Sequence, residues 1–350
     1  MNLVVIPTFN RSYKLGRVLD FYASYGPRFR VVVLDASTDE KHQAMNQAAV
    51  ERYPDFARRV PTPHQRDVVE RLLSFLDAVD EELIAIGTDE DPFFPDFLDA
   101  AFEHLRGRPD YVAATGRYIT FARSIMGMKR ISFWTDSFVG FDIDNDDPAL
   151  RVINFQRANS AGVPPLFWSV RRKSAFIESM KKGMRLSHGS GQEFLDQINT
   201  CVMGKIWISD LPMLLRDESR FKYQPEKHRD VGKHYIGDKD LAEIVNIARE
   251  FWGDSVTVAV RAVASWYVPN GNGESFESRL NKRVYCRFNA IPEARSSRSL
   301  RLLESAIRWS CVGGNLVSQF FAYLYFLRYM RLKGKARMFV RMSRTVPVNK

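Results

Sequence analysis

Cysteine is scarce in this chain, and that scarcity narrows the classes of protein to which it can belong. Only Cys201, Cys286 and Cys311 occur in 350 residues, and no two of them form a C-x-x-C motif. Their odd number and wide spacing argue against a disulfide framework and against a cysteine-based zinc site. We therefore expect a protein of a reducing, cytoplasmic compartment.

Two sequence features are missing near the start of the chain. Met1 and Asn2 lead directly into the apolar run at residues 3–6, with no positively charged leader, so no secretory signal is expected. The loop after this run reads Pro-Thr-Phe-Asn-Arg and lacks the glycine fingerprint of dinucleotide-binding folds. Its absence argues against NAD or FAD as a cofactor.

The positive charge of the chain is not evenly spread. Lys and Arg number 51 against 41 Asp and Glu, which gives a net charge of +10. Residues 301–350 contain ten of these basic residues and the single acid Glu304, a net +9, so residues 1–300 are almost neutral. Because the charge is terminal and has no recognition-helix context, we do not expect a nucleic-acid partner.

Short apolar runs alternate with helical periodicity along the first part of the chain. Residues 3–10, 30–35 and 83–86 are typical of strands, and a helical pattern follows each of them. This alternation predicts an α/β fold with a parallel sheet. Further strands are expected at residues 111–121, 205–209 and 213–216, helices at about 65–79, 97–105 and 174–181, and a mobile surface loop over 124–147.

A D-x-D arrangement, Asp89 and Asp91, follows the strand at residues 83–86 directly. In parallel α/β sheets, ligands bind in the crevice beyond the carboxyl ends of the strands. Paired carboxylates there suit Mg²⁺ or Mn²⁺ carrying a substrate diphosphate. The alternative is a pair of solvated turn residues ahead of the helix that begins near Pro95, and the motif alone leaves both interpretations open.

Three other charged residues have a functional and a structural interpretation. Asp35, at a strand end, can accept hydrogen bonds from a nucleotide base or ribose, or stabilise the next helix N-terminus. Arg66 can reach a phosphate or lie on a solvated helix face. Glu193 is expected in the first turn of a helix beside a Gly-rich loop, where it can act as a general base or complement the helix dipole.

Taken in order, several segments resemble a family-2-type inverting glycosyltransferase with a GT-A fold. The segments that carry this resemblance are residues 5–11, 33–39, 87–95, 109–118, 167–171 and 191–193. They cover about residues 1–220, and the most similar bacterial subgroup does not identify a sugar. The resemblance implies a GT-A-like, Rossmann-type, mostly parallel sheet flanked by helices and a nucleotide-diphosphate sugar as donor.

The resemblance also assigns roles to individual residues. The donor-binding residues that it implies, together with Arg66, are Pro7, Thr8, Asn10, Arg11, Asp35 and Asp89. Asp89 and Asp91 would hold Mn²⁺ or Mg²⁺, with His228 or His234 as a further ligand. The general base of the family belongs to a Glu-Asp pair, but residues 192–194 here read Gln-Glu-Phe, so Glu193 is the candidate and Asp196 the alternative.

We expect three regions: a glycosyltransferase domain at 1–220, a polar helical extension at 221–300 and an apolar and basic segment at 301–350. The apolar stretch at 311–327 is marginal for a membrane span and fits a helix in the membrane interface held by anionic lipid; a core helix is the alternative. The expected function is sugar transfer to a glycan or lipid-linked acceptor, in bacterial surface glycan or glycolipid synthesis at the inner face of the cell membrane. A non-catalytic sugar-nucleotide-binding or membrane scaffold protein is the alternative.

Overall fold

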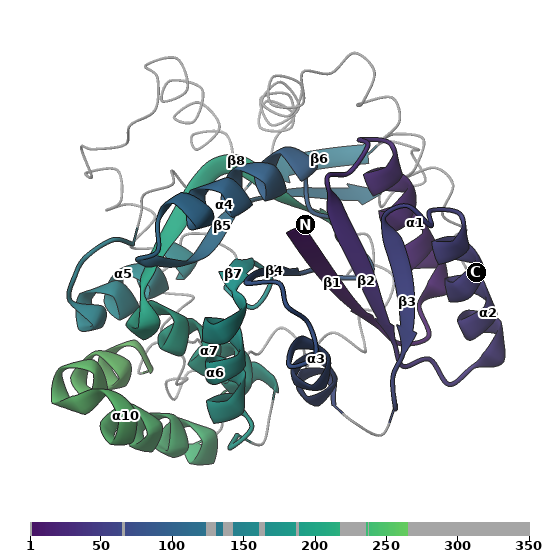
Figure 1. Ribbon diagram of the computed structural model, residues 1–350. Helices are drawn as coiled ribbons and strands as arrows, with labels where there is room; N and C mark the ends of the chain where they lie inside the picture. Colours follow the sequence, from purple (N-terminus) through teal and green to yellow (C-terminus); the bar gives the residue numbers. More distant parts are fainter. Residues whose placement is uncertain are drawn as a thin grey trace, which may run out of the picture.

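The computed structural model describes residues 2–64, 67–123, 131–135, 143–160, 165–186, 189–217, 236 and 238–264. A central sheet runs through the molecule, with helices packed on both of its faces (Figure 1). The strands are β1 (Asn2–Thr8), β2 (Phe29–Asp35), β3 (Ala57–Pro61), β4 (Leu83–Ile86), β5 (Tyr111–Arg123), β6 (Ile131–Thr135), β7 (Val170–Arg172) and β8 (Lys205–Asp217). The helices are α1 (Ser12–Ala23), α2 (Glu40–Glu51), α3 (Val68–Leu76), α4 (Pro95–Gly107), α5 (Pro148–Ser160), α6 (Lys173–Gly183), α7 (Gly189–Met203) and α10 (Asp238–Ala264).

The sheet is mixed but mostly parallel. Its order is β3-β2-β1-β4-β7-β5-β6, and β8 pairs with β5 outside this path. The strands β3, β2, β1 and β4 are mutually parallel, whereas β7 is antiparallel to both β4 and β5. The predicted α/β fold, with a mixed, mostly parallel sheet flanked by helices and a helix at its C-terminal side, is therefore confirmed.

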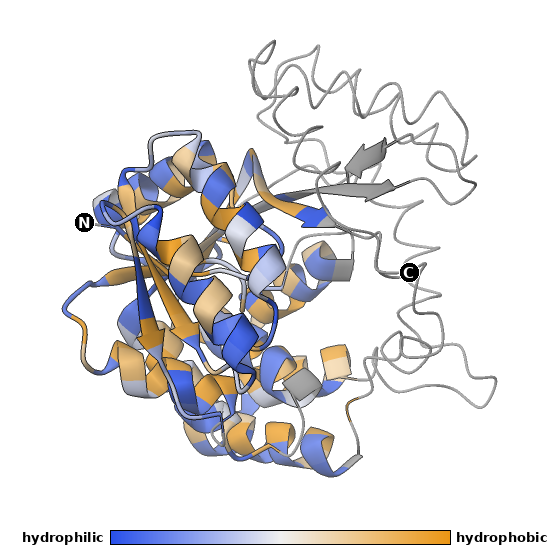
Figure 2. Ribbon diagram, turned by 90° about the vertical axis from the view of Figure 1, so that its right-hand side faces the viewer, coloured by the Kyte–Doolittle hydropathy of each residue, from blue (hydrophilic) through white to orange (hydrophobic). Residues whose placement is uncertain are grey.

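Alternating side chains of the inner strands pack on opposite faces of the sheet. Val4 and Ile6 of β1 join a buried cluster with α1, α2 and α4, while Leu3 and Val5 join another with α3 and α6. The strands therefore carry hydrophobic residues between two layers of helices (Figure 2). This burial on both faces explains why the strands read as continuous apolar runs in the sequence.

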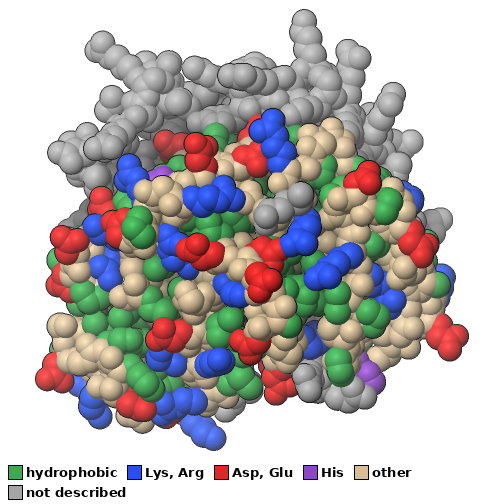
Figure 3. Space-filling model, in the orientation of Figure 1, with side chains coloured by type: hydrophobic (Ala, Val, Ile, Leu, Met, Phe, Trp, Pro, Cys, Tyr) green, Lys and Arg blue, Asp and Glu red, His purple; other side chains and the backbone are tan. Residues whose placement is uncertain are grey.

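A third apolar cluster joins α5, α7 and α10 to β5 and β8. The backbone of α10 is kinked at Gly253, whose φ is 81°. In the part of the chain that the structure describes, no helix is both long and apolar enough to cross a bilayer. Acidic and basic side chains are interspersed over the face shown in Figure 3, as expected from the near neutrality of residues 1–300.

Several elements differ from the expectations. The edge strand β3 and the helix α5 were not expected, and β6 lies inside the stretch at 124–147 that we expected to be a loop. The two short strands expected at 205–209 and 213–216 form one strand, β8, because irregular pairing with β5 carries the ladder past the break. The part of the expected helical extension that follows residue 264 lies outside the described residues.

Candidate functional site

Three polar side chains gather at the carboxyl ends of neighbouring parallel strands. Thr8 ends β1, its register partner Asp35 ends β2, and Asp89 lies in the turn just past β4. β1 pairs with β2 on one side and with β4 on the other, so the strand order reverses here. Such a switch point is where open α/β sheets bind ligands. All three side chains are buried.

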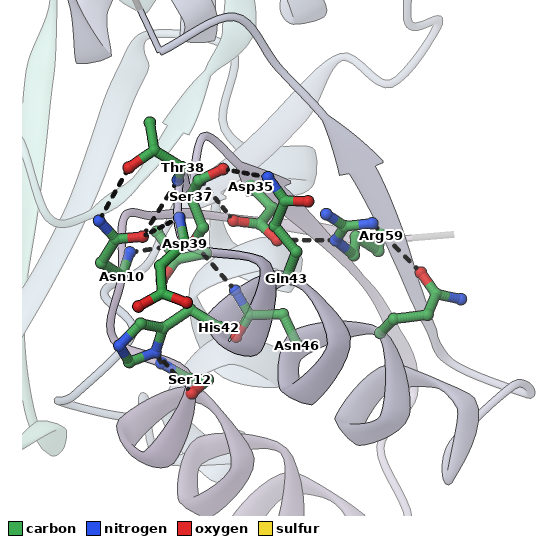
Figure 4. Close-up of polar contacts among 12 residues, drawn as sticks. Asn10, Ser12, Asp35, Ser37, Thr38, Asp39, His42, Gln43, Asn46 and Arg59 are labelled. Atoms are coloured by element: carbon green, nitrogen blue, oxygen red, sulfur yellow. Dashed lines mark hydrogen bonds and ion pairs between the residues drawn. The ribbon is translucent and has the colours of Figure 1, made fainter.

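Asp35 is satisfied by its own neighbours. One carboxylate oxygen accepts a hydrogen bond from the backbone amide of Ser37 at 2.9 Å, and the other pairs with Arg59 Nε at 2.7 Å (Figure 4). Burial alone raises the pKa of this carboxyl, but the hydrogen bonds from Ser37, Arg59 and Asn46 outweigh burial, so the pKa of Asp35 lies below its ordinary value. Asp35 is therefore ionised at neutral pH and braces β2 against β3.

Asn10 joins the loops that follow β1 and β2. Its φ of 53° lies in the left-handed region, which Asn tolerates better than most residues. The side-chain oxygen accepts hydrogen bonds from the backbone amides of Thr38 at 3.1 Å and Asp39 at 3.3 Å (Figure 4). Pro7 lies in β1 immediately before Thr8. The donor-binding roles of Asn10 and Pro7 stay predictions.

Asp89 lies at the centre of a charged cluster. Its Oδ2 accepts a hydrogen bond from Thr8 Oγ1 at 2.8 Å, and its Oδ1 pairs with Arg11 Nη1 at 3.1 Å. Arg11 also lies 3.6 Å from Glu90, which pairs with Lys14. Burial raises the pKa of Asp89, although Arg11 and Thr8 oppose this shift. The bond between Thr8 and Asp89 ties β1 to the acidic turn at the switch point.

The acidic turn is closed locally and anchored to a distant strand. Thr88 Oγ1 accepts a hydrogen bond from the Asp91 amide at 2.7 Å, and the side chain of Asp91 is half-buried. The next residues pair with β8, where Phe94 N donates to Met213 O at 2.8 Å and Leu215 N donates to Pro92 O at 3.0 Å. The residues that follow the acidic turn, including Pro92, are therefore held in place by hydrogen bonds to β8.

The surroundings of Asp89 do not favour the predicted divalent ion, and the metal role of Asp91 stays a prediction. Oδ2 of Asp89 accepts a hydrogen bond from Thr8 and Oδ1 accepts one from Arg11, so the positive charge beside Asp89 is already supplied by a guanidinium. Among the residues that the structure describes, no three His, Cys, Asp or Glu side chains form a metal-binding group. The residues in place thus suit an anionic ligand facing Arg11 better than a cation facing Asp89.

Glu193 lies further from the helix start than expected. Helix α7 begins at Gly189, so residues 189–192 are its first turn rather than a Gly-rich loop, and Glu193 opens the second turn, half-buried. Only Gly204 separates α7 from β8, so α7 runs back along the sheet. Its N-terminal end therefore points toward the edge at which β4, β5 and β8 end. The general-base role of Glu193 stays a prediction.

Asp196 has a different environment. Its side chain and that of Arg171 are both 0% exposed and form an ion pair, with Arg171 Nη1 at 2.9 Å from Oδ1 and 2.8 Å from Oδ2. Ser179 Oγ also donates to Asp196 Oδ1 at 2.6 Å. This network joins α7 to β7 and α6, and its complete burial favours a structural role for Asp196 over proton transfer to a substrate.

Other predicted residues lie outside the described ones. These are Arg66, His228, His234 and the segment at 301–350. Conversely, Arg59 and Lys14 contact the acids at this edge but were not among the residues predicted from the sequence. The position of Lys14 three residues after Arg11 at the start of a helix was a usable signal, because residues at that spacing share a helix face. The pairing of Arg59 with Asp35 depends on the register of an edge strand that was not predicted.

No family model and no curated protein sequence matches the chain. Among solved structures, it is similar to Staphylococcus aureus TarS, with 13% identity, a TM-score of 0.46 and coverage of 93% of this chain and 55% of that one. It is also similar to the mannosyltransferase PcManGT from Pyrobaculum calidifontis in complex with GDP-Man and Mn²⁺, with 13% identity and a TM-score of 0.46, over 94% of this chain and 86% of that one.

A third similar structure is glucosyl-3-phosphoglycerate synthase from Mycobacterium tuberculosis in complex with Mn²⁺, UDP and phosphoglyceric acid. The identity is 15% and the TM-score 0.42, over 70% of this chain and 78% of that one. At these values the comparison describes the course of the backbone.

Proposed function

We propose that this chain is a glycosyltransferase that takes a sugar from a nucleotide-diphosphate donor and transfers it to an acceptor hydroxyl with inversion. The observation that carries the proposal is the hydrogen bond between Thr8 and Asp89 across β1 and β4, flanked by Arg11 and Asp35. Polar and charged groups of both signs thereby meet at the ligand-binding edge of an α/β sheet. They match a ligand that carries both hydroxyl groups and phosphate.

The chemistry of sugar transfer divides among these residues. A departing diphosphate needs positive charge, which Arg11 offers at the site, and the acceptor hydroxyl needs a base. Asp35, with Arg59 behind it, is assigned to the nucleoside, because an ionised carboxylate at this strand end accepts hydrogen bonds from a ribose or a base. Glu193 is assigned as the general base, since α7 brings it toward the same edge of the sheet.

A divalent ion was also predicted from the sequence. Asp89 does not suit it as the site stands, and His228 lies outside the described residues, so no step of the proposed reaction is assigned to a metal. The experiments instead compare binding and turnover with and without a divalent ion, Mn²⁺ or Mg²⁺. A glycan or lipid-linked acceptor and attachment to the inner face of the cell membrane through residues 301–350 complete the proposal, on the basis of the charge of that segment.

The test is a screen of the full chain against a panel of nucleotide sugars, with and without Mn²⁺. Donor binding is read as a thermal shift, and turnover as release of the nucleoside diphosphate. We expect one donor to raise the melting temperature and to be hydrolysed slowly in the absence of an acceptor. No shift with any donor would overturn the proposal.

A second function, a sugar-nucleotide-binding scaffold without catalysis, is favoured by one observation. Asp196, the other acid near Glu193, is fully buried in its pair with Arg171, so only Glu193 remains as the predicted base on α7. In the same screen a scaffold would show a thermal shift and no release of nucleotide. Turnover of the bound donor would reject it.

A further inference from the structure

The acidic turn after β4 is paired with two cations from the start of α1. Arg11 Nη1 lies 3.1 Å from Asp89 Oδ1, and Arg11 Nη2 lies 3.6 Å from Glu90 Oε1. Lys14, on the same face of α1, pairs with the other oxygen of Glu90. Two cations from the start of α1 therefore balance two of the three carboxylates of the turn, Asp89 and Glu90.

The four side chains differ sharply in exposure. Asp89 and Glu90 are 4% and 8% exposed and Lys14 is 15% exposed, whereas Arg11 is 41% exposed. Lys14 therefore lies mostly within the buried turn, while the side chain of Arg11 contacts Asp89 and Glu90 and is still partly exposed. Of these four side chains, Arg11 is therefore the most accessible to an anion from solvent.

We propose that Arg11 is the group that binds the donor diphosphate, with Lys14 neutralising the acidic turn behind it, so that diphosphate binding does not require a divalent ion. The inference rests on the proposed function and narrows it, because it assigns the recognition of the phosphates to a side chain. A guanidinium suits this task, since its planar donors pair bidentately with phosphate oxygens.

The geometry also opposes the arrangement in which Asp89 holds a metal. A divalent cation at Oδ1 would either displace Arg11 or lie beside it, and like charges at such distances repel strongly in a buried site. A diphosphate is instead attracted to Arg11, because its charge is opposite to that of the guanidinium, which it would share with Asp89. In addition, Arg11 is the N-cap of α1, and a helix N-terminus favours negative charge.

The experiment measures binding of UDP, GDP, CDP and ADP to the full chain by calorimetry, in excess EDTA and in saturating Mn²⁺. We expect the best ligand to bind in EDTA within about threefold of its affinity in Mn²⁺. Arg11→Gln should weaken this binding by about tenfold or more, the loss expected for a hydrogen bond to a charged group. Arg11→Lys, which keeps the charge, should recover part of the affinity.

The matched control is Arg52→Gln. Arg52 is 52% exposed and pairs with Asp20 at 2.9 Å, so the substitution also breaks a half-exposed Arg–Asp pair. It lies at the end of α2, away from the carboxyl edge of the sheet. We expect the affinity for the diphosphate to be the same as that of the unmodified chain.

A second variant decides the question if Arg11→Gln does not fold. Asp89→Asn keeps an acceptor for Thr8 and removes the charge that holds Arg11, so diphosphate should bind more tightly in EDTA. The inference would be overturned if Asp89→Asn lost diphosphate binding. It would also be overturned if binding required Mn²⁺ and was unchanged in Arg11→Gln. Either result would leave the proposed glycosyltransferase function intact. Failure of every nucleoside diphosphate to bind, with or without Mn²⁺, would overturn both.

Discussion

A buried carboxylate such as Asp35 persists only when its neighbours compensate for the water it has lost. Asp35 is 2% exposed and has this compensation from Ser37 and Arg59. Removing its charge therefore lowers the stability of the fold through the loss of an ion pair and of hydrogen bonds. Its place at the end of β2, paired with Arg59 of β3, makes it a brace for the sheet edge.

We predict that Asp35→Asn lowers the free energy of unfolding at pH 7 by about 1–3 kcal/mol, because Arg59 loses its charged partner. The folded-state pKa of Asp35 lies below its ordinary value of 3.8. Its stabilising contribution is therefore complete above that value and is lost as the pH falls through the folded-state pKa. Urea unfolding of the variant and the unmodified chain should show a gap that narrows below about pH 4.

The control for this titration is Asp55→Asn, because Asp55 is an exposed acid close to the start of β3. It should change the unfolding free energy little at either pH. An equal loss of stability for Asp35→Asn at pH 7 and at pH 3 would contradict the ion-pair explanation.

Glu193 carries the catalytic part of the proposal. We predict that Glu193→Gln lowers the rate of sugar transfer by about 10²–10⁴-fold, the range for loss of a general base, while the donor still produces a thermal shift. The measurement is product formation at saturating donor. Glu178→Gln, in the exposed i,i+4 pair with Lys182, is the control for a lost surface acid and should leave transfer unchanged. Full activity of Glu193→Gln would remove it from the mechanism.

The positions of Asp35 and Asp89 could be predicted from the sequence, because each acid directly follows a buried apolar run and therefore lies at the carboxyl end of a strand. Their partners were harder to predict. The pairing of Arg59 with Asp35 follows from the register of β3 on β2, and the pairing of Arg11 with Asp89 follows from the angle at which the chain enters α1. Such contacts are decided by tertiary geometry, and no spacing in the sequence encodes them.

At the scale of elements, the pair Arg171 and Asp196 connects β7, α6 and α7. We predict that Asp196→Ala lowers the free energy of unfolding by about 3–5 kcal/mol, because it leaves the fully buried Arg171 without a counter-charge. Replacing both residues together, with Arg171→Met and Asp196→Leu, should recover part of this loss. Chemical denaturation of the three variants measures the effect. A stable Asp196→Ala variant that cannot transfer sugar would instead support a catalytic role.

Contact between β5 and β8 depends on a glycine. A Cβ atom at Gly116 would lie 2.8 Å from the backbone oxygen of Leu211 and 3.0 Å from Met213 Cβ. We therefore predict that Gly116→Ala destabilises the fold by about 1–3 kcal/mol, because backbone atoms cannot yield to it. Thermal unfolding measures the loss.

The comparison for this glycine is Gly107→Ala at the end of α4, where a Cβ atom would meet nothing within 4 Å. That substitution should leave the melting temperature unchanged or raise it slightly, since alanine favours a helix. Equal melting temperatures for the two variants would mean that β8 lies further from β5 than the structure shows.

Helices and strands with a clear hydrophobic pattern in the sequence could be predicted. Those that form because of contacts with neighbouring elements could not. The strands β1, β2 and β4 are buried on both faces and stand out as apolar runs. In contrast, β3 has the sequence Ala-Arg-Arg-Val-Pro and pairs only along β2, so its strand character comes from the sheet edge rather than from its residues. Helix α5 is similar, since its weakly patterned sequence becomes helical where Asp147 caps it and α7 and α10 cover it.

At the scale of the whole molecule, the order of the chain produces the site. The path from β1 to β2 and back to β4 brings residues 8, 35 and 89 to one edge, although up to 81 positions separate them in sequence. The parallel pairing of β1, β2 and β4 could be predicted, because each connection between them is long enough to hold a helix, whereas the edge strand β3 and the antiparallel β7 could not. The topology leaves undetermined which of the charged groups at that edge faces the ligand, and the greater exposure of Arg11 is the reason that we propose it for this role.

The segment at 301–350 concerns the molecule as a whole, because it holds nine of the ten net positive charges of the chain. We predict that its deletion shifts the protein from the membrane pellet to the supernatant in cell fractionation. Each basic residue near an anionic surface contributes about 1 kcal/mol, so the loss should be almost complete.

A full-length variant separates charge from the apolar stretch at 311–327. Replacing Arg331, Lys333, Lys335 and Arg337 by Gln removes four charges, which corresponds to about 4 kcal/mol or nearly a thousandfold in partition at low salt. High salt should release the unmodified protein in the same way, because exposed charges are screened. If the variant without the basic residues stays in the pellet and only the deletion releases the protein, apolar insertion rather than charge holds it. Unchanged sedimentation of both would place the membrane contact elsewhere in the chain or nowhere.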